Sequence, residues 1–161
     1  MAVKRSAGIL LYRGAADQAE VLLVHPGGPF WAKKDLGAWS VPKGEYEDPE
    51  EPRACALREL GEELGPAAPS LAPGDLVELG SVRQKSGKEV ECWTARADFD
   101  PAALRSNCFE MEWPPRSGRR QEFPEVDRAE WFGSEAARTK INPAQVAFLD
   151  RLFGHLHPVV P

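Results

Sequence analysis

Short apolar runs separated by Gly, Pro and charged residues set the pattern along this chain. Runs of about four to eight residues rich in Val, Ile, Leu and aromatic side chains are typical of strands, and Gly and Pro mark the turns between them. The pattern predicts strands over residues 6–13, 20–26, 75–84, 89–99, 108–113 and 128–132. The first two are expected to pair with each other around a short polar loop, and so are the next two.

Two further segments have the features of helices. One is expected to begin with Asp48 as N-cap and Pro49 at the first helical position, and to end at Gly65 as C-cap. The other covers residues 142–156, with Asn142 as its N-cap. Strands, one helix, more strands and a terminal helix favour an α/β or α+β sandwich around a mixed sheet.

Two long segments have neither pattern. Residues 27–44 are punctuated by Gly and Pro, and such a long loop in a compact domain is usually functional or disordered. Trp31 and Trp39 within it favour an ordered loop. Residues 114–125 are expected to form a basic loop.

The first helix concentrates acidic residues on one side. At about 3.6 residues per turn, Glu59, Glu62 and Glu63 cluster on a face well separated from the leucines of the same helix. A solvated acidic face is the common explanation of such a charge run. Here, however, the carboxylates repel each other at this spacing and lie near the negative end of the helix dipole. Mg²⁺ or Mn²⁺, which prefer oxygen ligands, would relieve both effects.

Composition narrows the class of protein. The net charge of −5 disfavours a nucleic-acid partner but leaves room for a small anionic substrate held by a local basic patch. Three widely spaced cysteines suggest neither a disulfide framework nor a zinc site, which fits a reducing cytoplasm. The apolar run near the N-terminus is too short for a signal peptide, and no run has the length of a membrane span.

The segment 44–66 resembles the Nudix box, Gly-x5-Glu-x7-Arg-Glu-U-x-Glu-Glu-x-Gly-U, where U is a bulky aliphatic residue. All seven fixed positions of the box are present, namely Gly44, Glu50, Arg58, Glu59, Glu62, Glu63 and Gly65. The last U is Pro66, a departure that puts local packing in doubt more than metal binding. Residues 38–44, "AWSVPKG", are similar to the W-x-x-P-K-G sequence of Nudix enzymes that act on dinucleoside polyphosphates. The resemblance implies one Nudix domain over residues 1–161, with an α/β/α sandwich fold and a central mixed β-sheet.

The resemblance also implies roles for individual residues. Glu59, Glu62 and Glu63 would bind Mg²⁺ or Mn²⁺, with a backbone carbonyl near Lys43 or at Gly44 as a further ligand. The catalytic set would comprise Glu59, Glu62, Arg58 and Glu125, with Arg58 holding Glu50 in place. Glu125, which lies in a loop after the box, is a candidate general base or extra ligand, and its rivals are Glu122 and Asp127.

Cations and aromatic side chains are expected to meet the substrate. The candidates for substrate binding are Lys43, Lys34, Arg83, Arg119 and Trp31. Packing is the favoured role of Trp39, and the three histidines form no ligand pattern.

The implied activity is divalent-metal-dependent hydrolysis of a phosphoanhydride in a nucleoside diphosphate-linked substrate. A dinucleoside polyphosphate or a nucleoside triphosphate is preferred. ADP-ribose or another nucleotide sugar, and a non-catalytic nucleotide-binding Nudix module, are the alternatives. The expected partner is this small nucleotide, without nucleic acid or membrane, and the chain would be a monomer or a homodimer.

Overall fold

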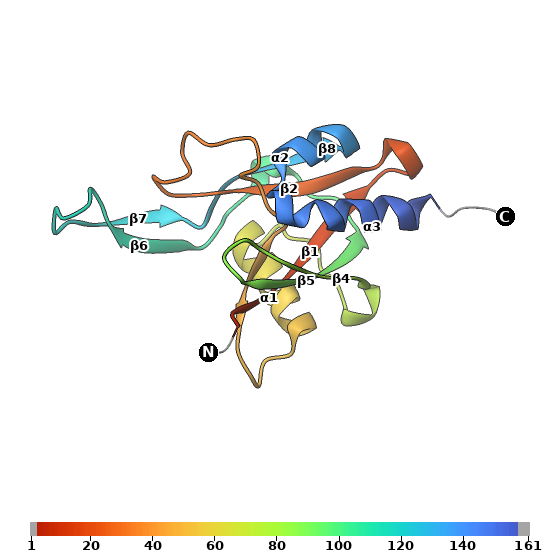
Figure 1. Ribbon diagram of the computed structural model, residues 1–161, viewed down its shortest axis with the longest axis horizontal. Coiled ribbons are helices and arrows are strands. Elements are labelled where there is room, and N and C mark those ends of the chain that lie inside the picture. Colours follow the sequence, from red (N-terminus) through yellow and green to blue (C-terminus); the bar gives the residue numbers. More distant parts are fainter. Residues whose placement is uncertain (1–2, 158–161) are drawn as a thin grey trace.

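The computed structural model describes residues 3–157 and contains a mixed sheet between helices (Figure 1). The strands are β1 (Arg5–Arg13), β2 (Glu20–Pro26), β3 (Lys43–Tyr46), β4 (Val77–Arg83), β5 (Glu89–Arg96), β6 (Cys108–Glu112), β7 (Arg120–Pro124) and β8 (Val126–Gly133). The helices are α1 (Pro52–Leu64), α2 (Ser134–Lys140) and α3 (Val146–Leu156). Short 3₁₀ turns cover Ala16–Gln18, Pro73–Asp75, Pro101–Ala103 and Pro143–Gln145.

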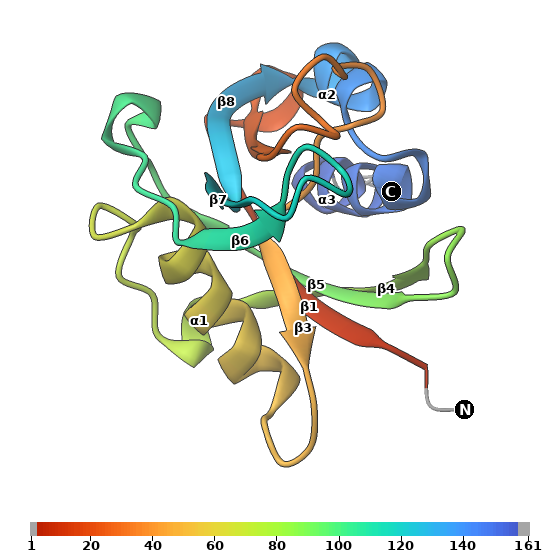
Figure 2. The same cartoon turned by 90° about the vertical axis from the view of Figure 1, so that its left-hand side faces the viewer.

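The central sheet has the strand order β4-β5-β1-β2-β8, and β3 pairs with β1 beside this path. β1 runs parallel to β5 and antiparallel to β2 and β3, so the sheet is mixed. Helix α1 lies on one side of the sheet, and α2 and α3 lie on the other (Figure 2). This arrangement confirms the expected α/β/α sandwich.

Two strands, β2 and β3, pair with the same edge of β1 at different points along it, so the sheet forks between them. β3 pairs with the first half of β1, where Gly8 lies opposite Lys43, whereas β2 pairs with β1 at Tyr12 and Arg13. A Cβ on Gly8 would lie 2.4 Å from the carbonyl oxygen of Pro42, so a side chain there would push the incoming chain away. The fork places the start of β3 next to α1, where the acidic residues lie.

Alternation along β1 divides the core into two layers. Ile9 and Leu11 belong to the cluster that contains Leu60 and Leu64 of α1. Leu10, between them, belongs to the opposite cluster beneath α3. Successive side chains of a strand point to opposite faces, so a strand covered on both sides is apolar throughout. Each fully buried leucine contributes about 1.5–3 kcal/mol to stability.

Helix α1 begins later than the sequence predicts. Glu51, not Asp48, is its N-cap, and Pro52, not Pro49, stands in the first turn. If the helix began at Pro49, Pro52 would have to donate the N–H that bonds to the Asp48 carbonyl, and proline has no N–H. A residue before proline also avoids helical dihedrals, and Glu51 is extended with ψ 138°.

The other end of α1 agrees better with the sequence. The N–H of Gly65 donates to the carbonyl of Gly61, and Gly65 has φ 91°, which favours glycine. Pro66, at the last position of the motif, is exposed. Its departure from the aliphatic pattern therefore costs no core packing.

Residues 114–125 are not wholly a loop, which corrects the prediction. Arg120–Pro124 form β7, which pairs with β6 in a two-stranded hairpin that extends away from the sandwich (Figure 1). The sequence gives no apolar pattern for this strand because it is mostly polar and exposed. Cross-strand pairing with β6, including Phe109 opposite Phe123, supports it. β3 and α2 also lacked a predictive pattern, because each is short.

The terminal helix splits into two parts. The side chain of Asn142 accepts a hydrogen bond from the Ala144 N–H, as a cap should, but it caps the 3₁₀ turn Pro143–Gln145 that precedes α3. No helix among residues 3–157 is both long and apolar enough to span a membrane.

Candidate active site

Three carboxylates from two distant segments converge beside the fork. Oxygen atoms of Glu59, Glu63 and Glu125 all lie within 4.8 Å of one another. Glu59 and Glu63 are one helical turn apart on α1, which places them on one face. Glu125 lies between β7 and β8, where its carbonyl accepts from the Gly27 N–H at 2.9 Å and its N–H donates to the Asn107 carbonyl at 2.8 Å. These backbone bonds fix the position of Glu125 independently of its side chain.

Glu62 does not join this cluster. Arg58 donates to Glu62 at 3.0 Å and to Glu59 at 2.9 Å, and it binds Glu50 through two nitrogens at 2.8 and 2.9 Å. The paired contact with Glu50 has the fork geometry that guanidinium and carboxylate groups favour. Arg58 therefore joins the segment before α1 to the acidic face of the helix.

Burial and mutual repulsion raise the pKa values of the convergent carboxyls. Burial, followed by the charge of Glu62, raises the pKa of Glu59 to about 7. Burial also raises the pKa of Glu63 to about 8, with Glu59 and Glu125 adding to the effect. The pKa of Glu125 is raised by burial and by Glu62. Three carboxylates this close are costly when ionised unless a cation lies between them.

The carboxyl group of Glu59 leaves no room for a side chain at residue 44, so glycine is required there. A Cβ on Gly44 would lie 1.9 Å from the carboxyl carbon of Glu59, so Glu59 rests directly on the backbone of β3. The carbonyl of Gly44 accepts a weak bond from the Cys55 thiol at 3.5 Å, and the N–H of Lys43 donates to Glu63 at 3.3 Å. Burial and the nearby Lys88 lower the pKa of the Lys43 ammonium. The donor set is made of carboxylate and carbonyl oxygens, which suit Mg²⁺ and Mn²⁺ rather than softer metals.

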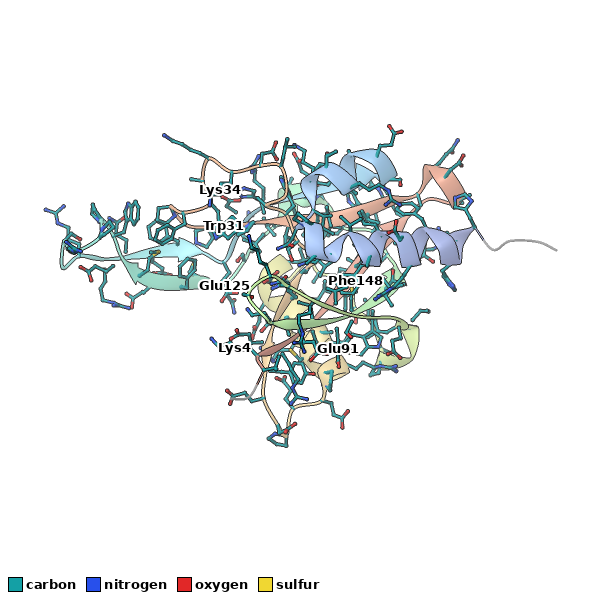
Figure 3. All side chains as sticks on the ribbon, viewed as in Figure 1. Lys4, Trp31, Lys34, Glu91, Glu125 and Phe148 are labelled. Carbon is teal, nitrogen blue, oxygen red and sulfur yellow. The ribbon has the colours of Figure 1, made fainter. Side chains whose placement is uncertain are left out.

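The carboxylates line an open hollow of about 380 Å³ that has an aromatic side. Trp31, from the loop between β2 and β3, and Phe109, from β6, line it together with the acids. Trp31 and Glu125 lie on the same side of the molecule (Figure 3). Phe109 was not predicted as a site residue, because only the hairpin brings β6 to this place.

Two glycines let the loop approach the hairpin. A Cβ on Gly27 would lie 1.9 Å from the carbonyl oxygen of Pro124, and one on Gly28 would lie 3.0 Å from the ring of Phe109. The consecutive glycines in the sequence were the available signal for this close approach. The aromatic side of the hollow thus depends on contacts between two segments far apart in the chain.

The other predicted residues lie at varying distances from the carboxylates. Lys34 places its ammonium 5.0 Å from the centre of the Trp31 ring. Arg83 lines a neighbouring hollow with Lys88, and that hollow meets the acidic one at Glu45. Arg119 is exposed in the connection between β6 and β7 and does not line the acidic hollow.

The rivals of Glu125 and the remaining tryptophan occupy different settings. Glu122 is exposed on β7. Asp127 is bound to the ring of His25 at 2.7 Å. Trp39 is buried, which confirms its expected packing role.

A comparison with protein-family models identifies the family. The model described as the NUDIX domain matches residues 3–152 of the chain. The chain belongs to the Nudix family. It is accordingly a Nudix pyrophosphohydrolase. Enzymes of this family hydrolyse nucleoside diphosphate-linked compounds and generally need divalent metals.

Solved structures share the fold at low sequence identity. An Ap4A hydrolase of C. elegans in a binary complex is 21% identical, with a TM-score of 0.62 over 94% of this chain and 98% of that one. The NUDIX domain of Shewanella oneidensis NrtR, complexed with ADP ribose, is 17% identical, with a TM-score of 0.63 over 97% and 90%. The C-terminal domain of mouse MUTYH, in complex with human PCNA, is 21% identical, with a TM-score of 0.59 over 99% and 92%. No curated protein sequence matched the chain.

Proposed function

We propose that the protein hydrolyses a phosphoanhydride bond of a dinucleoside polyphosphate or a nucleoside triphosphate with Mg²⁺ or Mn²⁺. The observation that carries this proposal is the convergence of Glu59, Glu63 and Glu125 within 4.8 Å, in a hollow that also has an aromatic side. Carboxylates bind divalent cations, which in turn bind phosphates, and aromatic rings stack on nucleobases. The hollow thus offers both kinds of contact that a nucleotide needs. Residues 44–66 are the Nudix box in this proposal.

Glu59 and Glu63 are the proposed ligands, the Gly44 carbonyl is proposed to add a third oxygen, and Glu125 faces the cation from the opposite segment. A divalent cation held there would supply positive charge that offsets the charge of the phosphate oxygens and would make a nearby water more acidic. Glu62 lies outside the cluster, so its proposed part is to set the charge around Glu59 and Glu125, whose pKa values it raises.

Glu125 is the proposed proton acceptor for the attacking water. Burial raises its pKa, which brings a carboxylate closer to the range in which it accepts a proton near neutral pH. It comes from a segment separate from α1, so its side chain can face the substrate from the side opposite the helix. Arg58 acts on the helix side, where it orients Glu59 and Glu62.

Trp31 and Phe109 are the proposed contacts of the base, and cations are proposed to bind the outer phosphates. Lys43 lines the hollow itself. Lys34 lies beside Trp31, and Arg83 lines the hollow that adjoins at Glu45. Arg119 would reach substrate only if the hairpin bent toward the hollow.

A nucleotide sugar such as ADP-ribose is the alternative substrate. The likeness to a Nudix domain complexed with ADP ribose supports it as well as the likeness to an Ap4A hydrolase supports the first choice, since both show the fold alone. A non-catalytic nucleotide-binding module is less well supported, because Glu59, Glu62, Glu63 and Glu125 are all present.

The test is a substrate panel with the purified protein. It contains a dinucleoside tetraphosphate, the nucleoside triphosphates and ADP-ribose, each with Mg²⁺ or Mn²⁺ and each in ¹⁸O-water to locate the phosphorus attacked. We expect cation-dependent turnover of the polyphosphates that Glu63→Gln abolishes and the exposed Glu122→Gln leaves intact. Absence of turnover of any compound, together with nucleotide binding that survives EDTA, would show a binding module instead.

A further inference from the structure

His25 is a fully buried polar residue that the proposed chemistry does not use. It lies near the end of β2, and none of its surface is exposed. Both ring nitrogens are engaged at short distance, Nδ1 with a carboxylate oxygen of Asp127 at 2.7 Å and Nε2 with the carbonyl oxygen of Lys34 at 2.7 Å. A buried ring with two partners from different segments joins those segments.

The two partners hold the ring from both sides. The carbonyl of Lys34 can only accept a hydrogen bond, so it is satisfied by an N–H at Nε2. The carboxyl group of Asp127 is the partner of Nδ1 on the other side of the ring. The edge of the ring also packs on Trp39, with centroids 5.2 Å apart, which restricts its orientation.

The two partners belong to the two segments that build the hollow. Asp127 follows Glu125 by two residues at the start of β8. Lys34 ends a turn in which its N–H donates to the Trp31 carbonyl at 2.9 Å. Trp31, Lys34 and Glu125 lie on one side of the molecule (Figure 3).

The other anchors of this loop lie on either side of the turn from Trp31 to Lys34, where Phe30 packs on Trp113 and Asp35 binds Lys140 and the Trp39 indole. The Gly27 N–H donates to the Glu125 carbonyl at one end, and the Gly37 N–H donates to the Thr139 carbonyl at the other. The turn from Trp31 to Lys34 lies between them, and the His25 ring holds its last carbonyl. The backbone of Glu125, in contrast, is held by bonds of its own. Loss of the ring should therefore disturb Trp31 more than Glu125.

We propose that His25 is a positioning residue for substrate, which fixes the turn carrying Trp31 and Lys34 against the strand that follows Glu125. The aromatic side of the hollow then keeps a set distance from the carboxylates. This inference rests on the proposed function, because it assigns Trp31 to the nucleotide.

The kinetic test compares two His25 variants with a control. His25→Gln can place a donor at only one of the two positions of the ring nitrogens, and His25→Phe keeps an aromatic ring against Trp39 but no donor. The control is His155→Gln, on the exposed end of α3. We expect KM for the nucleotide to rise about tenfold in both His25 variants while kcat changes less than about threefold, as the loss of a charged hydrogen bond implies. Asp127→Asn should raise KM in the same direction. A KM unchanged in folded His25→Phe, or a loss of kcat alone, would overturn the proposal.

A second measurement needs no turnover. The amide hydrogen of Lys34, which bonds to the Trp31 carbonyl, should exchange about tenfold faster in His25→Phe than in the wild type, because the turn opens locally. Unchanged exchange in His25→Phe would refute the proposal. If the wild type hydrolysed no nucleotide but the exchange difference appeared, the proposed function would fail while the link between His25 and the turn would stand.

Discussion

Glu125 differs from the other carboxylates of the cluster because its position comes from a separate segment and its own backbone bonds. Replacing it with glutamine should leave the fold intact and remove the proton acceptor. We predict that Glu125→Gln lowers kcat by about 100-fold or more, the usual scale of general-base catalysis. Steady-state kinetics with saturating Mg²⁺ measures it.

Glu122→Gln is the matched control for that substitution. Glu122 lies three residues before Glu125, on β7, carries the same kind of side chain and is exposed. Its kcat should stay within about twofold of wild type, since surface substitutions away from a site have small effects. Equal losses in both variants would show that the negative charge of this segment matters and the position of Glu125 does not.

Gly44 gives a second prediction at the scale of single residues. In Gly44→Ala, the new methyl group would occupy the place of the Glu59 carboxyl, 1.9 Å from its carbon. We expect turnover and Mg²⁺ affinity to fall by at least about tenfold, because a ligand is displaced. Isothermal titration with Mg²⁺ and kinetics measure both.

Gly61→Ala provides the comparison, since a Cβ there meets nothing within 4 Å. Gly61 lies inside α1, where alanine is favoured over glycine by about 1 kcal/mol. This variant should therefore be more stable and equally active. A Gly44→Ala variant as active as Gly61→Ala would mean that Glu59 has room to move without loss of function.

At the scale of elements, the start of α1 leaves a cap position unfilled. Glu51 is the N-cap but its side chain makes no capping hydrogen bond. We predict that Glu51→Ser stabilises the protein by about 0.5–1 kcal/mol, because serine can accept from the free N–H groups of the first turn. Urea unfolding measures the change.

Asp48→Ala tests whether Asp48, which the sequence favours as the N-cap, contributes to the start of α1. Within residues 3–157, the side chain of Asp48 makes only an exposed ion pair, with Arg5 at 3.2 Å, so its removal should cost less than about 0.5 kcal/mol. A cost of about 1 kcal/mol or more would be the value of a lost cap and would place the helix start at Pro49.

Elements differed in how well the sequence predicted them. β1 and β2 are buried on both faces, so they appear in the sequence as nearly continuous apolar runs that are easily recognised as strands. β7 has four exposed or half-buried polar and aromatic residues and gains its structure from β6. A strand that pairs only with its neighbour and covers no core has no apolar periodicity for a sequence to show.

At the scale of the whole molecule, a cation that binds the folded chain should stabilise it. We predict that Mg²⁺ or Mn²⁺ at about 100 times its dissociation constant adds about 2.7 kcal/mol. For a domain of this size, Tm would rise by roughly 5–10 °C. Differential scanning calorimetry measures the shift, which EDTA should reverse and Glu63→Gln should nearly abolish. An equal shift in Glu63→Gln would place the cation elsewhere.

The shift should also depend on pH. The pKa values of Glu59 and Glu63 in the folded chain, about 7 and about 8, lie above the ordinary 4.5. Above 4.5 the folded state therefore holds more protons than the unfolded one, and stability without cation falls as pH rises through 7 and 8. A bound cation replaces these protons, so its effect on Tm should be larger at pH 8 than at pH 6. An effect independent of pH would contradict this account.

The sequence by itself determined the family, the two-sided core and the acidic face of α1. Those features are local: seven box residues at fixed spacing, apolar runs, and Glu59 and Glu63 one turn apart. Their physical consequences follow from the geometry of a helix and a strand, and need no knowledge of what lies opposite.

Only the tertiary structure decided which acids meet and what faces them. Glu62 belongs to the same local pattern as Glu63, yet it turns to Arg58, and Glu125 takes its place beside the other two. Phe109 reaches the hollow because Gly27 and Gly28 let the loop lie on the hairpin. Which residues meet in the site therefore depends on contacts between segments that lie far apart in the sequence. The spacing of residues along the chain gives no information about those contacts.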